Sequence, residues 1–161
     1  MAYSDVSNIL WRERQLLELL MFKLEVEQCL LASGKTRWLA HATREIEMII
    51  DEVKQAELAR SLEVNQLCSL LGVSDVPTLR ALVEVAPDPW NGIFEEHRKA
   101  FLAATQEIVG LAETNRELLA RGYQAAREAL ASIGAERVET YGPAGIRLSH
   151  AGSTNLLDEV M

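Results

Sequence analysis

The chain has 161 residues, of which only 6% are aromatic and two are cysteines, and it contains no long apolar run. A membrane-spanning helix needs about 18 or more consecutive apolar residues, so we expect no membrane insertion. The N-terminus lacks a basic segment followed by an apolar one, so we expect no signal peptide. These absences favour a cytoplasmic protein. The cysteines, Cys29 and Cys68, each lie in an apolar helical pattern, and we expect both to be small buried residues rather than disulfide partners.

Basic residues are also scarce. Sixteen Lys and Arg stand against 24 Asp and Glu, which gives a formal net charge of −8. Binding to a phosphate backbone requires clustered Lys and Arg, and here the basic residues are scattered singly. We therefore expect no nucleic-acid partner.

What the chain does contain is apolar residues in a helical arrangement. They make up 48% of the sequence, too many for a disordered protein, and Leu, Ala and Glu predominate. The length suits one domain. We expect an all-α fold, an antiparallel bundle or coiled coil of long helices with a short middle helix and a flexible C-terminal tail.

Leucines recur every seven residues near the N-terminus and predict a helix from about Ser4 to Ala32, with Ser4 or Ser7 as its N-cap. The leucines in this line are Leu10, Leu17, Leu24 and Leu31. Such a repeat requires a neighbouring helix at a shallow angle. Ser33 and Gly34 should end the helix, and a short turn should lead into an antiparallel second helix. That helix is expected from Lys35 or Thr36 to Leu71. The local sequence would allow a break in it near Arg60 and Ser61.

The second half predicts a short helix from about Pro77 to Val85 and a long one from Trp90 to about Ile133. Phe94, Phe101 and Ile108 repeat at seven, and the same line reaches Asn115, Gly122 and Ala129. A polar Asn on such a seam costs stability but can fix the helix register. From Gly134 the periodicity is lost. We therefore divide the chain into a bundle domain of residues 1–133 and a flexible tail of residues 134–161.

Motifs for catalysis or metal binding are missing. Gly34, Lys35 and Thr36 resemble the end of a phosphate-binding loop, but Cys29 stands where the first Gly would be, so we interpret them as a helix-to-helix turn. No His follows a Glu by three residues, and His41 with Glu45 is typical of a solvated helix face. No nucleophile elbow is present. We expect no cofactor, no metal and no enzymatic activity.

Small and large apolar residues follow Asn115 in the last helix. They can form a face for another amphipathic helix, or they can pack within the bundle or in a homodimer, and the spacing alone leaves these alternatives open.

Several segments in order resemble the FlgN family of flagellar export chaperones. They are the leucine-repeat helix ending EVEQCLLASG, the second helix starting WLAHATREIE, the middle LCSLLGVSDVPTLRALVEVAPDPW, the helix segment LAETNRELLARG, and the tail with YGPAG and LSH. The sequence departs from the family in its middle, because GVSDVPTLRALVEVAPDPW is an elaborate connection that shorter family members lack. The resemblance implies a cytoplasmic, non-catalytic chaperone for the hook-associated proteins FlgK and FlgL, which binds their C-terminal helical region and delivers them to the cytoplasmic domain of the export-gate protein FlhA.

The resemblance also suggests two sets of functional residues. The expected substrate face consists of Asn115, Leu118, Leu119, Tyr123, Ala126, Leu130 and Ile133. The expected docking motif for the export gate consists of Tyr141, Gly142 and Gly145. Two alternatives stay open: a homodimeric coiled-coil adaptor with a passive tail, and a Tyr141 that folds back onto the bundle.

Overall fold

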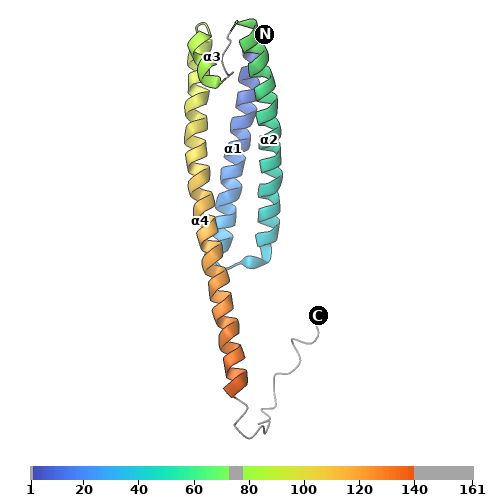
Figure 1. The fold of residues 1–161 in the computed structure, drawn as a ribbon, viewed down its shortest axis with the longest axis vertical. Coiled ribbons are helices and arrows are strands. Elements are labelled where there is room, and N and C mark those ends of the chain that lie inside the picture. Colours follow the sequence, from blue (N-terminus) through green and yellow to red (C-terminus); the bar gives the residue numbers. More distant parts are fainter. Residues whose placement is uncertain (1, 73–77, 140–161) are drawn as a thin grey trace. The chain divides into compact units, whose positions relative to one another are not determined.

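The computed structural model describes residues 2–72 and 78–139, and within them the chain is helical, with no strand. The elements are the α-helices α1 (Ala2–Ala32), α2 (Leu39–Leu70), α3 (Leu79–Val85) and α4 (Trp90–Glu139), and the 3-10 helix η1 (Thr36–Trp38) (Figure 1). The predicted all-α fold is confirmed. The described residues divide into two units between Ala120 and Arg121, and the first unit begins at the N-terminus.

In the first unit, α1 and α2 form the predicted antiparallel hairpin, and the first part of α4 runs alongside them (Figure 1). Gly34 follows the last turn of α1 and has a positive φ of 67°. Its N–H donates to the Leu31 carbonyl at 3.2 Å, and the Lys35 N–H donates to the Leu30 carbonyl at 3.0 Å. This pair of bonds satisfies the last carbonyls of a helix and needs a left-handed residue, for which Gly is best suited. The helix-to-helix turn is therefore as predicted.

The start of α1 differs from the expectation. The helix already includes Ala2, so Ser4 and Ser7 lie inside it and neither is its N-cap. Tyr3 packs against the core, with its ring stacked on that of Trp90 at a centroid distance of 5.8 Å. Tertiary packing of this first turn extends the helix beyond the capping signals in the sequence.

Helix α2 also differs, because it passes through Arg60 and Ser61 without a break. Arg60 is engaged in the bundle: its Nε lies 3.4 Å from Oε2 of Glu13, and its guanidinium lies 5.6 Å from the ring of Phe101. These contacts hold the helix at the point where local sequence suggested an interruption.

Two apolar clusters hold the first unit together. The first joins α1, α2, α3 and α4 and comprises Val6, Leu10, Val64, Leu67, Cys68, Leu82, Ala86 and Phe94. The second comprises Leu20, Leu24, Ile46 and Ile49, with Val53, Ile108 and Leu111 packed against it. Because three long helices contribute to both clusters, the seven-residue repeats predicted from the sequence pack within one chain.

The short helix α3 begins at Leu79, two residues after the predicted start at Pro77, which lies outside the described residues. Thr78 is the N-cap, and its hydroxyl oxygen accepts a 3.1 Å hydrogen bond from the Ala81 N–H. A Thr side chain at this position satisfies a backbone donor that the helix cannot. Leu82 then buries the helix against the first core cluster.

The two cysteines have different environments. Cys68 is buried as predicted, and burial raises the pKa of its thiol. The prediction for Cys29 was wrong, because its side chain is exposed. Cys29 follows the buried Leu24 by five residues, which places it about 140° further around α1 and away from the core.

Helix α4 extends to Glu139, past the predicted end near Ile133. Gly134 does not end it, because only Gly34 and Gly72 have positive φ among the described glycines. A glycine inside a helix costs about 1 kcal/mol relative to Ala and need not stop it. Residues 140–161 lie outside the described range. The division into a bundle of residues 1–133 and a tail of residues 134–161 stays a prediction.

Two buried polar groups lie between the helices of the first unit. Glu13 of α1 is buried beside Arg60, but Oε2 of Glu13 makes no hydrogen bond, and burial raises the pKa of this carboxyl. His97 of α4 is buried against Trp11, with Nη1 of Arg14 donating to its Nδ1 at 3.5 Å. Since Arg can only donate, this contact suits a neutral imidazole with no proton on Nδ1.

His97 should make the stability depend on pH. Burial, with the charge of Arg14, lowers the pKa of His97 below 6.5, although Glu96 opposes the shift. The unfolded state then takes up a proton that the folded state excludes, so folding stability is lost as pH falls below 6.5. We expect the free energy of unfolding of the wild type to fall relative to that of His97→Leu as the pH is lowered from about 8 to about 5, measured by chemical denaturation. The raised pKa of Glu13 changes the stability with pH in the opposite direction, but it does so equally in the wild type and in the variant. Parallel pH curves would contradict this role of His97.

Candidate functional site

An exposed apolar face runs along α4 after Asn115. Leu119, Tyr123, Leu130 and Ile133 are each between 53% and 70% exposed, and Ala126 is also exposed. The spacing of these five residues alternates between four and three, which keeps them on one side of a helix that turns 100° per residue. We refer to these five residues as the apolar strip. Leu118, half-buried, is displaced from the strip by about 100°.

The apolar strip continues the side of α4 that is packed in the first unit. Counting helical turns, Leu119 and Leu130 lie on the same side as Phe94, Phe101 and Ile108, which pack into the two core clusters. The seven-residue line expected to reach Gly122 and Ala129 departs from this side, because a heptad falls about 20° short of two full helical turns. Both Gly122 and Ala129 are exposed.

Asn115 stands where this side of α4 changes from buried to exposed. It is 5% exposed, and its Nδ2 donates to the Leu24 carbonyl at 2.9 Å and to Oε2 of Glu27 at 3.0 Å. Its Oδ1 is buried without a hydrogen-bond partner. The other oxygen of Glu27, Oε1, accepts a 2.9 Å hydrogen bond from the Thr43 hydroxyl. The Glu27 carboxylate thus joins all three long helices.

A groove of about 240 Å³ lies beside this polar junction, within the first unit. Its lining residues are Leu24, Glu27, Leu31, Leu39, Thr43, Ala112, Asn115, Arg116 and Leu119. The structure therefore brings together Asn115 and Leu119 of the predicted substrate face. Asn115 contributes mainly to packing, since both hydrogens of its amide group point to α1 acceptors.

The sequence interpretation missed Glu27 and Thr43. A signal was present, because Glu27 follows Leu24 by three residues and precedes Leu31 by four, and so lies beside the buried line of α1. A carboxylate at that place needs hydrogen-bond donors from neighbouring helices. Which donors face it depends on helix pairing, and the sequence does not give that.

The predicted docking motif of Tyr141, Gly142 and Gly145 lies outside the described residues.

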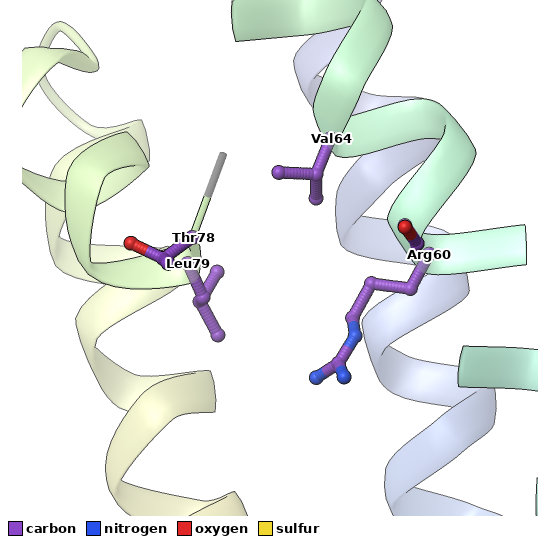
Figure 2. A pocket seen from close by; sticks show the side chains of 5 residues that line it. Arg60, Val64, Thr78 and Leu79 are labelled. Atoms are coloured by element: carbon purple, nitrogen blue, oxygen red, sulfur yellow. The ribbon is translucent and has the colours of Figure 1, made fainter. Parts of the chain in front are cut away.

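Another cavity, of about 290 Å³, lies between α2 and the start of α3. Figure 2 shows Arg60 and Val64 of α2 facing Thr78 and Leu79, with the Thr78 hydroxyl turned away from α2. Two of its polar residues have structural roles, because Arg60 attracts Glu13 and Thr78 caps α3, and Ser61 also lines the cavity. Among the described residues that line the cavity, no nucleophile is paired with a base.

The histidine and carboxylate that the sequence analysis considered, His41 and Glu45, take part in other contacts. The His41 ring is tilted against Trp38, and Glu45 accepts a 2.7 Å hydrogen bond from Lys23. Over residues 2–72 and 78–139, no three His, Cys, Asp or Glu side chains are grouped to hold a metal ion. No helix in these ranges is long and apolar enough to cross a bilayer.

Comparison with known proteins identifies the family. The family model described as FlgN protein matches residues 1–147. The chain belongs to the FlgN family. Members of this family are flagellar export chaperones rather than enzymes, and the present chain is a chaperone of this general kind. No curated protein and no solved structure matches the chain.

We expect Asn115→Ala to lower the free energy of unfolding by about 1–3 kcal/mol, because it removes one buried and one partly buried hydrogen bond and leaves Oε2 of Glu27 without its donor. Thr43→Val provides a matched comparison on the other side of the same carboxylate. Thr43 is exposed, so water can replace its hydroxyl and the loss should be under about 1 kcal/mol. Urea denaturation of both variants measures the difference, and an unchanged Asn115→Ala midpoint would contradict the proposed importance of the junction.

Proposed function

We propose that this FlgN protein acts in the cytoplasm and binds the C-terminal helical region of the hook-associated proteins FlgK and FlgL through the apolar strip of α4. Binding keeps these proteins from assembling before secretion and allows their delivery to the cytoplasmic domain of FlhA. The observation that carries the proposal is the apolar strip itself, since it exposes the side of α4 that is packed elsewhere along the same helix.

Physical chemistry supports a helical partner for this face. An amphipathic helix lays its i, i+3, i+4 and i+7 residues against an apolar face, and the strip has that spacing. Ordering a disordered segment costs roughly 2–5 kcal/mol of the interaction energy, so the complex has moderate affinity. Moderate affinity suits a chaperone that must release its cargo.

A second copy of the chain is the other candidate occupant. The alternating spacing of the strip is also that of a coiled-coil seam, which two copies could share. Sedimentation of the isolated protein separates the two functions. A cargo chaperone of the proposed kind keeps the strip available, whereas a tight dimer joined through the strip would favour the adaptor.

The double variant Leu119→Asp, Leu130→Asp should lose cargo binding, by at least about tenfold in Kd, because it places two charges in the proposed apolar contact. Both side chains are exposed, so the melting temperature should stay close to that of the wild type. Leu58→Asp, Leu62→Asp is a matched control, because these leucines of α2 are similarly exposed. Co-purification with FlgK or FlgL measures binding. Cargo retention by the first variant would refute the assignment of the strip.

Tyr141→Ala should weaken binding to the cytoplasmic domain of FlhA while leaving cargo affinity unchanged. The proposed reason is that Tyr141, followed by the turn-forming Gly142–Gly145 segment, presents an apolar ring with a polar tip to the gate. Titration calorimetry with each partner in turn tests this division of roles. Loss of cargo binding by this variant would show that the two functions are not separate.

A further inference from the structure

The sequence of α4 repeats a short pattern along the apolar strip. Arg116-Glu117-Leu118-Leu119 and Arg127-Glu128-Ala129-Leu130 share the form Arg-Glu-x-Leu and are eleven residues apart. Eleven residues make about three helical turns and rise about 16 Å, so equivalent positions return to the same side of the helix. Each copy therefore places its Leu in the apolar strip and its Arg at the same edge.

The charges around the strip follow from this repeat. With 100° per residue, Arg116 and Arg127 lie about 60–80° from the centre line of the strip, whereas Glu117 and Glu128 lie on the opposite side of α4. The other edge is formed by uncharged residues, among them Gly122, Ala125 and Ala129. In a chain of net charge −8, the charged residues that α4 itself places on one edge of the apolar strip between residues 116 and 134 are thus both arginines, although the Glu27 carboxylate of α1 lines the same groove as Arg116.

The contacts of the two arginines leave them available to a partner. Both side chains are exposed. Arg116 lines the groove beside Asn115, and no hydrogen bond or ion pair is found for it within the described part of the chain. The Arg127 guanidinium lies 6.0 Å from the ring centre of Tyr123, a cation–π contact that leaves its N–H donors free for an acid. Glu128, on the far side, instead accepts a 2.9 Å hydrogen bond from Gln124.

We propose that Arg116 and Arg127 select the cargo helix and fix its register, by pairing with acidic side chains about three turns apart on one edge of that helix. This inference rests on the proposed function of the strip and specifies its partner as an amphipathic helix with an acidic edge. The charge complementarity accelerates encounter and orients the helix, while the apolar strip provides most of the affinity.

The test uses the full-length protein and purified C-terminal fragments of FlgK and FlgL as probes. Arg116→Glu, Arg127→Glu should weaken binding of at least one fragment about tenfold or more and reduce the salt dependence of its association rate. Arg116→Lys, Arg127→Lys keeps the charges and should stay within about threefold of the wild type. The control Arg44→Glu, Arg121→Glu makes the same net-charge change at exposed positions away from this edge and should bind like the wild type.

The outcomes distinguish a failure of the basic edge from a failure of the proposed function. Loss of affinity in the Glu variant alone, with helicity and melting temperature unchanged, supports the basic edge. Equal losses in the Glu variant and the control would overturn it, because net charge alone would then explain the effect. Unchanged binding by the Glu variant, with cargo still lost by Leu119→Asp, Leu130→Asp, overturns the inference and leaves the proposed function standing. If the wild type binds neither fragment, the inference and the proposed function are both refuted.

Discussion

The hydrogen bonds of the buried Asn115 amide fix where the bundle of the first unit ends along α4. Its Nδ2 reaches a backbone carbonyl and a carboxylate of α1, and Thr43 of α2 holds the same carboxylate from the other side. A buried amide that loses such partners costs about 1–3 kcal/mol, so a one-residue slip of α4 against α1 is disfavoured. Apolar seams alone tolerate slips more easily, because hydrophobic contacts are not directional. The junction therefore favours one register of α4 against the hairpin of α1 and α2, and Asn115 lies where the packed part of α4 gives way to the exposed part.

The position of this junction divides α4 into a part that packs in the bundle and a part that exposes its apolar side. Before Asn115, the packed side of α4 carries bulky residues such as Phe94 and Phe101, which contact α1 and α2. After it, the same side carries Leu119, Tyr123 and Leu130, all exposed. Exposed apolar area is worth about 25 cal/mol per Å² when it is later covered, so the strip holds free energy that folding of the chain has not used. That free energy remains for association.

Helix type and order could be predicted from the sequence because periodicity and turn residues are local signals. Gly34 marked the end of α1 correctly, since its left-handed conformation is a local requirement. The errors came from tertiary contacts: Tyr3 packs on Trp90 and extends α1, and Arg60 stays helical while attracting Glu13. At the candidate site, the apolar strip followed from spacing, but the role of Glu27 depended on which helices surround it. The drift between a seven-residue repeat and the true helical period also misplaced Gly122 and Ala129.

A chaperone with exposed aromatic rings must avoid associating with every apolar surface, and the cations near those rings provide a physical means. Four large aromatic side chains are exposed in the described part of the chain, namely Trp11, Phe22, Trp38 and Tyr123. Each has an Arg or Lys over its ring, at centroid distances from 4.4 to 6.0 Å. Such exposed contacts are worth only about 0.5–1 kcal/mol, so a suitable partner can displace them easily. Arg14 and Lys23 already have the carboxylates of Glu96 and Glu45 beside them, but Arg127 has only its ring contact among the described residues. A partner that offers only apolar surface must desolvate Arg127 without compensation, whereas one with an acidic edge can pair with it. Under the proposed function, these cations therefore favour a cargo that carries acidic side chains beside its apolar surface.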